Sequence, residues 1–510
     1  MPCTTILVGK DASYDGSTII ARNEDSSNGE FTEKEFKVVQ PEDQPRHYTS
    51  VISHVEIDLP DNPMRYTSVP DALLKNGLWA EHGVNTLNVA MSATETLTSN
   101  ERVLGADPLV ELIPASADGQ TPEVPGGIGE EDMLTIVLPY ITSARDGVRR
   151  LGALLEEYGT YEMNGIAFSD VDEIWWLETI GGHHWIAKRV PDDSYVVMPN
   201  QLGIDEFDLE DAFGEQEEHM CSADLREFIE ENHLDLAVEN VSAFNPRLAF
   251  GSHSDSDHVY NTPRAWWIQR FFNPYDEDWD SVNALHSPVS DDIPWARQPE
   301  RKITIEDMKY ALSGHYQGTP YDPYGKDGSA ATRGQFRAIG INRNCDLCAI
   351  QIRPYASEAS RSIQWTAFGS NPFNTFVPFF TNVDAVPAYL TGTTETVDTA
   401  HNFYWANRVI GALADARYND NRAHIDRYVL KTGAAGVAAV KDADAKIAAF
   451  AATEGDAAVA TTEDKRARTI LEAANAAVCD LVQKETNDVL SKVLYTTSMS
   501  MTNAFSMSDN

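Results

Sequence analysis

The feature that most constrains the fold of this chain is a strand, turn and strand at its start, with a cysteine as the first strand residue. Residues 3–9 read CTTILVG, and residues 17–25 read STIIARNED. The turn-like stretch between these two apolar runs predicts a β-hairpin. Such a hairpin returns Arg22 and Asp25 towards Cys3.

The position of Cys3 determines what its thiol can do. If residues 1 and 2 are removed, Cys3 carries both a thiol and a free α-amino group. An α-amine has a pKa of about 7.7–8 and can therefore act as a general base near neutral pH. The guanidinium of Arg22 favours a neighbouring thiolate, and the carboxylate of Asp25 can hold the α-ammonium. The alternative is a buried cysteine that only packs on an apolar strand.

These residues resemble the opening of the dipeptidase A family of cysteine peptidases, which belong to the N-terminal-nucleophile hydrolases. The resemblance is carried by residues 1–10, 15–18 and 21–25. Four further segments resemble the family, at residues 83–85, 164–170, 173–179 and 196–201, which read GVN, NGIAFSD, EIWWLET and VVMPNQ. A weaker match lies at residues 261–266, which read NTPRAW.

The resemblance implies a fold and a mechanism. It implies a four-layer αββα sandwich of N-terminal-nucleophile hydrolase type, whereas composition supports only a mixed α+β fold. It also implies acyl transfer through a thioester on Cys3, with hydrolysis of unblocked dipeptides of broad side-chain type and no metal or cofactor. This mechanism requires the loss of residues 1 and 2, because a peptide-bonded Cys3 has no basic amine.

Four more residues take expected roles from the resemblance. Asn200 corresponds to an oxyanion donor of related acylases, and Thr94 corresponds loosely to a second donor position. Asn164 and Arg264 are expected in the substrate pocket. Ordinary structural alternatives stay open for each of them. Asn200 and Asn164 could cap turns, Thr94 could be a strand former, and Arg264 could be a surface cation.

Helical and strand patterns alternate through the first 400 residues. Apolar residues recur at helical spacing over residues 131–157, and Pro139 predicts a kink or a break in this helix. Strands are expected next, at residues 165–169, 173–179, 184–189 and 195–198. Earlier strand-like stretches lie at residues 49–57 and 77–95.

The composition changes beyond residue 395. Three Ala-rich segments predict helices, near residues 401–418, 437–451 and 462–492. We therefore expect a catalytic domain at residues 1–395 and a helical region at residues 396–510. The helical region is either an appendage or an integral part of the same domain.

Charge and cysteine content exclude several classes of protein. The chain has 79 acidic and 39 basic side chains and a formal net charge of −40, which opposes binding to nucleic acid and to anionic membranes. It has no basic and apolar leader and no run of about 20 apolar residues. Five cysteines form no disulfide framework. We expect a cytoplasmic protein, and the pair Cys345 and Cys348 is expected to be structural, because no second ligand pair for zinc is present.

Two other functions stay open. An N-acyl amide hydrolase, like the penicillin and bile-salt acylases, would have the same fold and an apolar slot for its substrate. A dipeptidase instead needs a carboxylate for the substrate ammonium and a donor for the substrate carboxylate. A catalytically silent interaction protein would keep Cys3 blocked. Dipeptides are the expected partners, and a homo-oligomer is compatible with the sequence.

Overall fold

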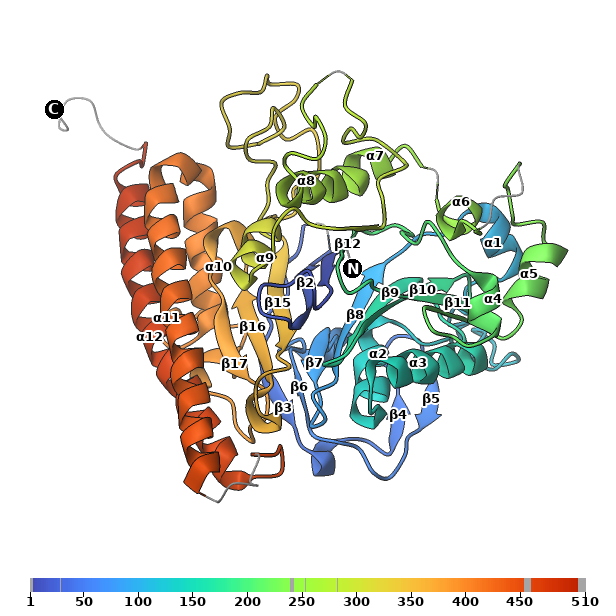
Figure 1. Ribbon diagram of the computed structural model, residues 1–510, viewed down its shortest axis with the longest axis horizontal. Helices are drawn as coiled ribbons and strands as arrows, with labels where there is room; N and C mark the ends of the chain where they lie inside the picture. Colours follow the sequence, from blue (N-terminus) through green and yellow to red (C-terminus); the bar gives the residue numbers. More distant parts are fainter. Residues whose placement is uncertain are drawn as a thin grey trace.

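Two antiparallel β-sheets form the middle of the molecule (Figure 1). The computed structural model describes residues 3–27, 29–238, 243–252, 254–281, 283–453 and 460–502, without the side chains of residues 93–95 and 453. The first sheet has the order β14 (Ala296–Arg297), β12 (Tyr195–Met198), β1 (Cys3–Val8), β2 (Thr18–Asp25), β15 (Asn344–Ile352), β16 (Ser362–Phe368) and β17 (Val377–Phe380).

The second sheet has the order β13 (His219–Cys221), β11 (His184–Arg189), β10 (Ile174–Ile180), β9 (Asn164–Ser169), β8 (Ala90–Thr96) and β7 (His82–Val84). Two further sheets have two strands each. One pairs β3 (Lys37–Val39) with β6 (Tyr66–Ser68), and the other pairs β4 (His47–Thr49) with β5 (Glu56–Asp58).

The hairpin expected from residues 3–25 is confirmed and lies in the centre of the first sheet. Strands β1 and β2 pair antiparallel, with Cys3 opposite Glu24 and Thr5 opposite Arg22. Because opposing residues of an antiparallel pair point to the same face, Cys3 and Arg22 share one face of the sheet.

The two faces of this hairpin enter different cores. Leu7 and Ile20 belong to a cluster that also contains Trp176 and Ile186 of the second sheet, so the two sheets pack face to face. The alternate residues, including Ile6, belong to a cluster on the outer face.

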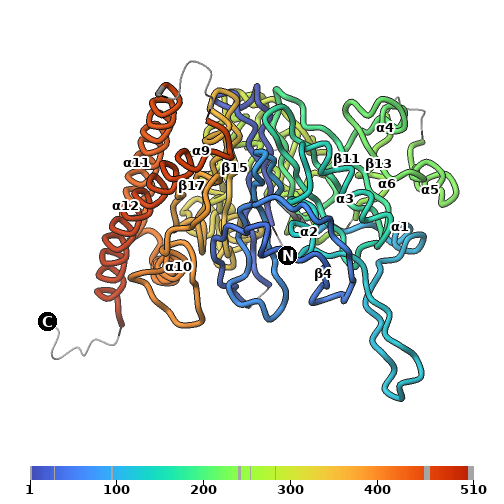
Figure 2. The backbone as a smooth tube through the Cα atoms, turned by 90° about the horizontal axis from the view of Figure 1, so that it is seen from below, coloured from blue at the N-terminus to red at the C-terminus, as the bar shows by residue number. Residues whose placement is uncertain are grey.

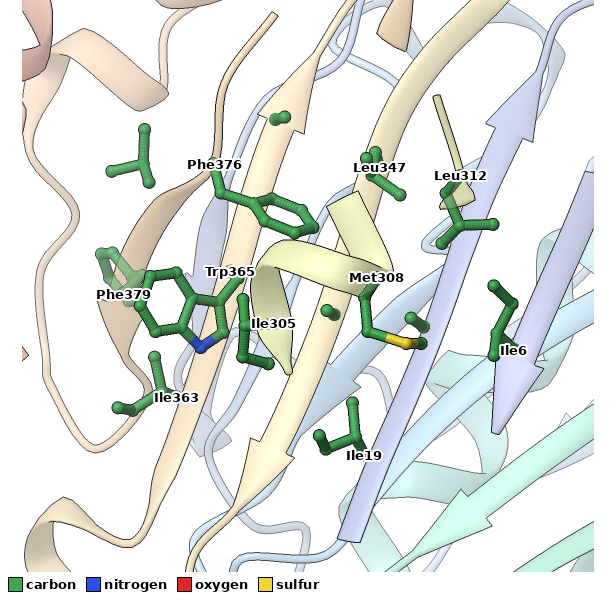
Figure 3. Close-up of a cluster of buried hydrophobic side chains, with 14 of the residues drawn as sticks. Ile6, Ile19, Ile305, Met308, Leu312, Leu347, Ile363, Trp365, Phe376 and Phe379 are labelled. Carbon is green, nitrogen blue, oxygen red and sulfur yellow. The ribbon is translucent and has the colours of Figure 1, made fainter. Parts of the chain in front are cut away.

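Helices cover both outer faces. On the first sheet lie α8 (Thr262–Phe272), α9 (Ile305–Ala311) and α10 (Phe403–Ala414). Figure 3 shows Ile305 and Met308 of α9 over this sheet, among Ile6, Ile19 and Trp365. On the second sheet lie α2 (Glu130–Val137) and α3 (Ala144–Tyr158), whose apolar residues share a cluster with strands β9 and β10. The order is therefore helices, sheet, sheet and helices.

The helix expected at residues 131–157 is split where the proline predicts a break. Pro139 lies in a 3-10 turn, Leu138–Tyr140, between α2 and α3, because a proline cannot donate the backbone hydrogen bond that a continuous helix needs. The Ser143 side chain then caps α3 by accepting a hydrogen bond from the nitrogen of Asp146. The strands expected at residues 165–198 are confirmed within one residue, although β12 belongs to the first sheet and not to the second.

The strand expected at residues 49–57 is wrong in extent, because most of these residues form the turn between β4 and β5.

Shorter helices lie within the connections between the strands. They are α1 (Glu101–Ala106), α4 (Leu209–Phe213), α5 (Leu225–Glu231), α6 (Pro246–Phe250) and α7 (Asp257–Tyr260).

Two long helices follow α10, and both views show them beside β17 (Figures 1 and 2). They are α11 (Tyr418–Thr453) and α12 (Lys465–Ser498). α11 is longer than expected because it continues through Gly433 and Gly436, which are poor helix formers. A Cβ atom on Gly436 would lie 3.2 Å from Pro378 of β17, so the glycine permits a close approach of the helix to the sheet.

The long helices share the outer core of the first sheet. Val440, Ala443 and Leu471 belong to the same cluster as Trp365 of β16. Arg353, next to β15, also donates to both carboxylate oxygens of Asp444, at 2.6 and 2.9 Å. None of the described helices has the length and apolar character of a membrane span.

The outer core predicts a large cost for truncating a strand residue. Leu347 is fully buried in this cluster, whereas Leu430 on α11 is 74% exposed. We expect Leu347→Ala to lower the free energy of unfolding by about 2–5 kcal/mol through lost burial and a residual cavity, and the matched control Leu430→Ala to change it by less than about 0.5 kcal/mol. Urea denaturation measures both, and equal effects would contradict the assigned core.

Candidate active site

Cys3 is the first residue of β1. At this end of the inter-sheet space, charged side chains take the place of apolar ones. Its side chain has the same orientation as Leu7, which packs in the inter-sheet core. Cys3 is fully buried. The Nη2 atom of Arg22 lies 2.8 Å from the Cys3 sulfur, at hydrogen-bonding distance. A cation at this distance favours the thiolate over the thiol.

Arg22 is held by two carboxylates from the side of the second sheet. Its Nη2 atom donates to Glu130 Oε1 at 3.0 Å, and its Nη1 atom forms an ion pair with Glu81. Burial by itself would lower the pKa of Arg22, but the charges of Cys3, Glu81 and Glu130 outweigh it and raise that pKa well above its ordinary value. The guanidinium therefore stays charged beside Cys3.

The backbone of Cys3 is held by Asn200 and Arg264. The nitrogen of Cys3 donates to Asn200 Oδ1 at 3.2 Å, and Arg264 Nη2 donates to the same oxygen at 2.7 Å. Arg264 Nη1 donates to the Cys3 carbonyl oxygen and to Thr4 Oγ1. Arg264 is fully buried, so the alternative of a surface cation is wrong.

The amide nitrogen of Asn200 is available to a ligand. Its Oδ1 atom accepts two hydrogen bonds, and this fixes the orientation of the amide. The Nδ2 atom is buried and has no acceptor among the described residues. A buried amide donor without a partner costs about 1–3 kcal/mol, so this atom is suited to bind an oxygen that develops negative charge.

Glu178 in β10 holds the loop that carries Asn200. Its Oε1 atom accepts from the nitrogens of Gly203 and Ile204 at 2.7 and 3.3 Å and from Trp176 Nε1 at 3.0 Å. Burial raises the pKa of Glu178 to about 7, although these hydrogen bonds act in the other direction. The carboxyl group fixes the loop by hydrogen bonding, and burial favours its neutral form.

Asp25 lies close to Cys3 in the sheet but faces the other way. It stands three residues after Arg22, and residues three apart in a strand point to opposite faces. Its carboxylate forms an ion pair with Arg337 and accepts from the side chains of Asn344 and Asn23. Its expected role at Cys3 stays a prediction.

The two other residues with expected roles, Asn164 and Thr94, lie on strands of the second sheet. Asn164 in β9 alternates with the residues that face the inter-sheet core, so it has the orientation of Ile166 towards α3. Its Nδ2 atom donates to the backbone oxygen of Glu162 at 3.3 Å. Its expected place in the substrate pocket stays a prediction. Thr94 lies in β8 at a register shift between residues 93 and 95, and its side chain is outside the described residues.

Several charged residues of the site could not be predicted from the sequence. Glu81, Glu130 and Arg337 surround the hairpin but lie about 60 to 310 residues further along the chain. No motif marks them. Glu81 and Arg337 stand in loops, and Glu130 opens α2 as the first of three consecutive acidic residues. Only the packing of the sheets brings them to Cys3.

The described residues offer no group of three or more metal-ligating side chains. Cys345 and Cys348 are both buried within β15, and burial raises the pKa of both thiols. The sulfur of Cys345 lies 2.6 Å from Ser26 Oγ. Both cysteines therefore pack within the sheet.

Comparison with known proteins identifies the family. The family model described as peptidase family C69 matches residues 2–431. The chain belongs to peptidase family C69. It is therefore a peptidase, as the resemblance of its opening residues implied.

Three similar proteins with dipeptidase names match most or all of the chain. A protein named dipeptidase from Bifidobacterium longum is 64% identical over 100% of both chains. A probable dipeptidase A from Streptococcus pyogenes serotype M3 is 54% identical, again over 100% of both chains. Dipeptidase A from Lactobacillus helveticus is 48% identical over 82% of each chain.

The buried carboxyl group of Glu178 predicts a pH-dependent stability. In the unfolded chain a glutamate ionises near its ordinary pKa of about 4.3, whereas Glu178 keeps its proton in the folded peptidase until about pH 7. The folded state therefore binds more protons between these values, and its stability falls as the pH rises through this window. Glu178→Gln keeps a carbonyl acceptor for the loop and removes the titration.

We expect the stability of Glu178→Gln relative to the parent to rise by about 3 kcal/mol between pH 4.5 and pH 7.5. Urea denaturation at both pH values measures this change. Glu157 is exposed, so Glu157→Gln is the control. Its free energy of unfolding should differ from that of the parent by the same amount at both pH values. If the free energies of unfolding of the parent and of Glu178→Gln differ by the same amount at both pH values, Glu178 does not keep its proton in the folded state.

Proposed function

We propose that this peptidase is a cysteine dipeptidase that hydrolyses unblocked dipeptides of broad side-chain type through a thioester on Cys3. The observation that carries the proposal is the pair of contacts at Cys3. Arg22 lies 2.8 Å from its sulfur, and Asn200 lies 3.2 Å from its nitrogen. The names of the full-length relatives support the substrate class.

We assign the fold to the four-layer αββα sandwich of the N-terminal-nucleophile hydrolases. Two face-to-face sheets, helices on both outer faces and a cysteine that opens a central strand support this assignment. The helices beyond residue 395 share the outer core, so we regard them as integral to the catalytic domain.

The first chemical step is attack by sulfur on the peptide carbonyl. The α-amine of processed Cys3 takes the thiol proton, and the sulfur forms a bond to the carbonyl carbon. The negative charge moves to the carbonyl oxygen, where Asn200 Nδ2 can donate to it. Collapse of this intermediate breaks the peptide bond, and the ammonium of Cys3 gives its proton to the departing amine.

Water completes the cycle. The α-amine of Cys3 takes a proton from water, which attacks the thioester carbonyl carbon. The carbon to sulfur bond then breaks, and the first amino acid leaves as a carboxylate. Residues 1 and 2 must be absent in this scheme, since only a terminal Cys3 has a basic nitrogen.

The charge around Arg22 favours a substrate with a free ammonium. Glu81 and Glu130 both bind Arg22, and Glu162 Oε1 accepts from the nitrogen of Glu130 at 2.7 Å. Burial and the charge of Glu130 raise the pKa of Glu162 to about 7. These three carboxyl groups offer oxygen atoms to a substrate ammonium, and a bound ammonium favours their ionised forms. An acylase would need an apolar slot here.

We place the reaction in the cytoplasm. All five cysteines are buried thiols, and none of them forms a disulfide. Such cysteine usage is typical of a reducing compartment.

Replacing the sulfur tests the nucleophile. We expect Cys3→Ala to lower kcat for an unblocked dipeptide such as Leu-Leu by at least about 10⁴-fold, because the acyl group has no acceptor atom. Far-ultraviolet circular dichroism should remain that of the parent. Release of free amino acids measures the activity, and Cys221→Ala, a buried cysteine in β13, is the control.

A parent protein that hydrolyses only N-acylated dipeptides would move the function to the amide hydrolases. A parent with no activity on either set would require mass spectrometry of its first residues. A folded Cys3→Ala variant with parental activity would overturn the mechanism.

Changing the amide of Asn200 tests the oxyanion contact. Asn200→Asp keeps an acceptor for the Cys3 nitrogen and for Arg264 but replaces the Nδ2 donor by an oxygen. We expect kcat to fall by about 10²- to 10³-fold with a smaller change in KM, because the donor acts on charge that develops in the transition state. An unchanged kcat would exclude this role.

A further inference from the structure

A second buried guanidinium, that of Arg337, lies beside the site. Its Nη2 atom forms the ion pair with Asp25, and its side chain is only 5% exposed. Its Nε and Nη1 atoms are buried and have no hydrogen-bond partner among the described residues. Two unused donors on a buried cation are costly, and each can give one charge-assisted hydrogen bond to a carboxylate.

The surroundings of Arg337 carry more positive than negative charge. Its Cζ atom lies 5.0 Å from the ring centre of Tyr260, and Arg343 Nη2 donates to the hydroxyl group of Tyr260 at 3.1 Å. Within the described ranges, Asp25 is the one carboxylate that forms an ion pair with either arginine. Arg337 thus has one carboxylate partner and a second cation nearby, which leaves a place for a second anion.

Arg337 lies close to Cys3 but away from the acidic group. Its partner Asp25 follows Glu24, the residue that pairs with Cys3. Arg22 and Asp25 point to opposite faces of β2, so the carboxylates around Arg22 and the cations around Asp25 lie on opposite sides of the strand. Figure 1 shows α2 and α8 on these two sides.

The charge state of Arg337 suits an anion. Burial and the charge of Arg343 lower its pKa to about 9, and a Cys3 thiolate acts in the opposite direction. Arg337 is therefore charged at neutral pH, and its guanidinium lies within electrostatic range of the Cys3 sulfur.

We propose that Arg337, supported by the charge of Arg343, binds the C-terminal carboxylate of the dipeptide and so restricts cleavage to a bond one residue from that carboxylate. The inference rests on the proposed dipeptidase function. The carboxylate of a dipeptide lies one residue, about 3.3–3.6 Å of chain, beyond the scissile carbonyl. A group that binds it must therefore lie next to Cys3, as Arg337 does.

The direction of binding follows from the two charged groups. The ammonium of the dipeptide would lie towards Glu130 and its carboxylate towards Arg337, so the site would bind a zwitterion in one direction.

The test compares a dipeptide with its C-terminal amide, for example Leu-Leu and Leu-Leu-NH₂, which differ only in the anionic group. We expect the parent to prefer the free acid by about 10- to 100-fold in kcat/KM, the range of a charge-assisted hydrogen bond. Arg337→Gln should lose this preference, with most of the change in KM, and Arg337→Lys should recover part of it. Arg353→Gln, which removes another buried arginine from an ion pair, should keep the parental ratio.

The outcomes separate the two proposals. A parent that cleaves neither compound would count against the dipeptidase function itself. A parent that cleaves both equally, or an Arg337→Gln variant that loses activity on both by the same factor and keeps the ratio, would overturn only the role of Arg337. Collapse of the ratio in Arg337→Gln, with the amide cleaved at close to the parental rate, would support it.

Discussion

The contact of the Arg22 guanidinium with the Cys3 sulfur is the interaction on which the site depends. Burying an arginine costs several kcal/mol unless its charge is compensated. Here Glu81 and Glu130 provide compensation from the second sheet, so the same cation joins the two sheets and faces the thiol. Loss of both carboxylate contacts would leave a buried charge beside Cys3 without its counter-ions.

The arrangement of strands explains why one end of the inter-sheet space is charged. Alternate residues of β1 and β2 point into this space, and those in the middle, Leu7 and Ile20, are apolar. Towards the end of the strands the same orientation belongs to Cys3, Arg22 and Glu24. The apolar middle stabilises the two sheets, and in the proposed mechanism the charged end holds the reacting groups among buried side chains.

The residues around Cys3 form two groups of opposite charge. Carboxylates surround Arg22 on one side of β2, and Arg337 and Arg343 surround Asp25 on the other side. A neutral or N-acylated substrate would use only part of this arrangement. A zwitterionic dipeptide would use both groups, which is why the charge distribution supports the dipeptidase over the acylase.

Residues near one another in the chain could be predicted from the sequence. The hairpin, the nearness of Arg22 to Cys3 and the break at Pro139 follow from patterns within about 25 residues, because strand alternation and proline geometry are local. Asn200 and Arg264 were expected only through resemblance to a family, and the structure places both at the backbone of Cys3. Asn164 was expected in the pocket, but strand alternation directs it towards α3.

Only the tertiary structure determines which charged side chains lie around Cys3. Glu81, Glu130 and Arg337 carry no motif, and their role depends on packing between elements that lie far apart in the chain. The sequence by itself determined where a nucleophile could stand and which strand would carry it, because those features depend on local backbone preferences. The electrostatic field at that nucleophile is a sum over distant side chains, and only the folded arrangement of sheets, helices and loops sets those distances.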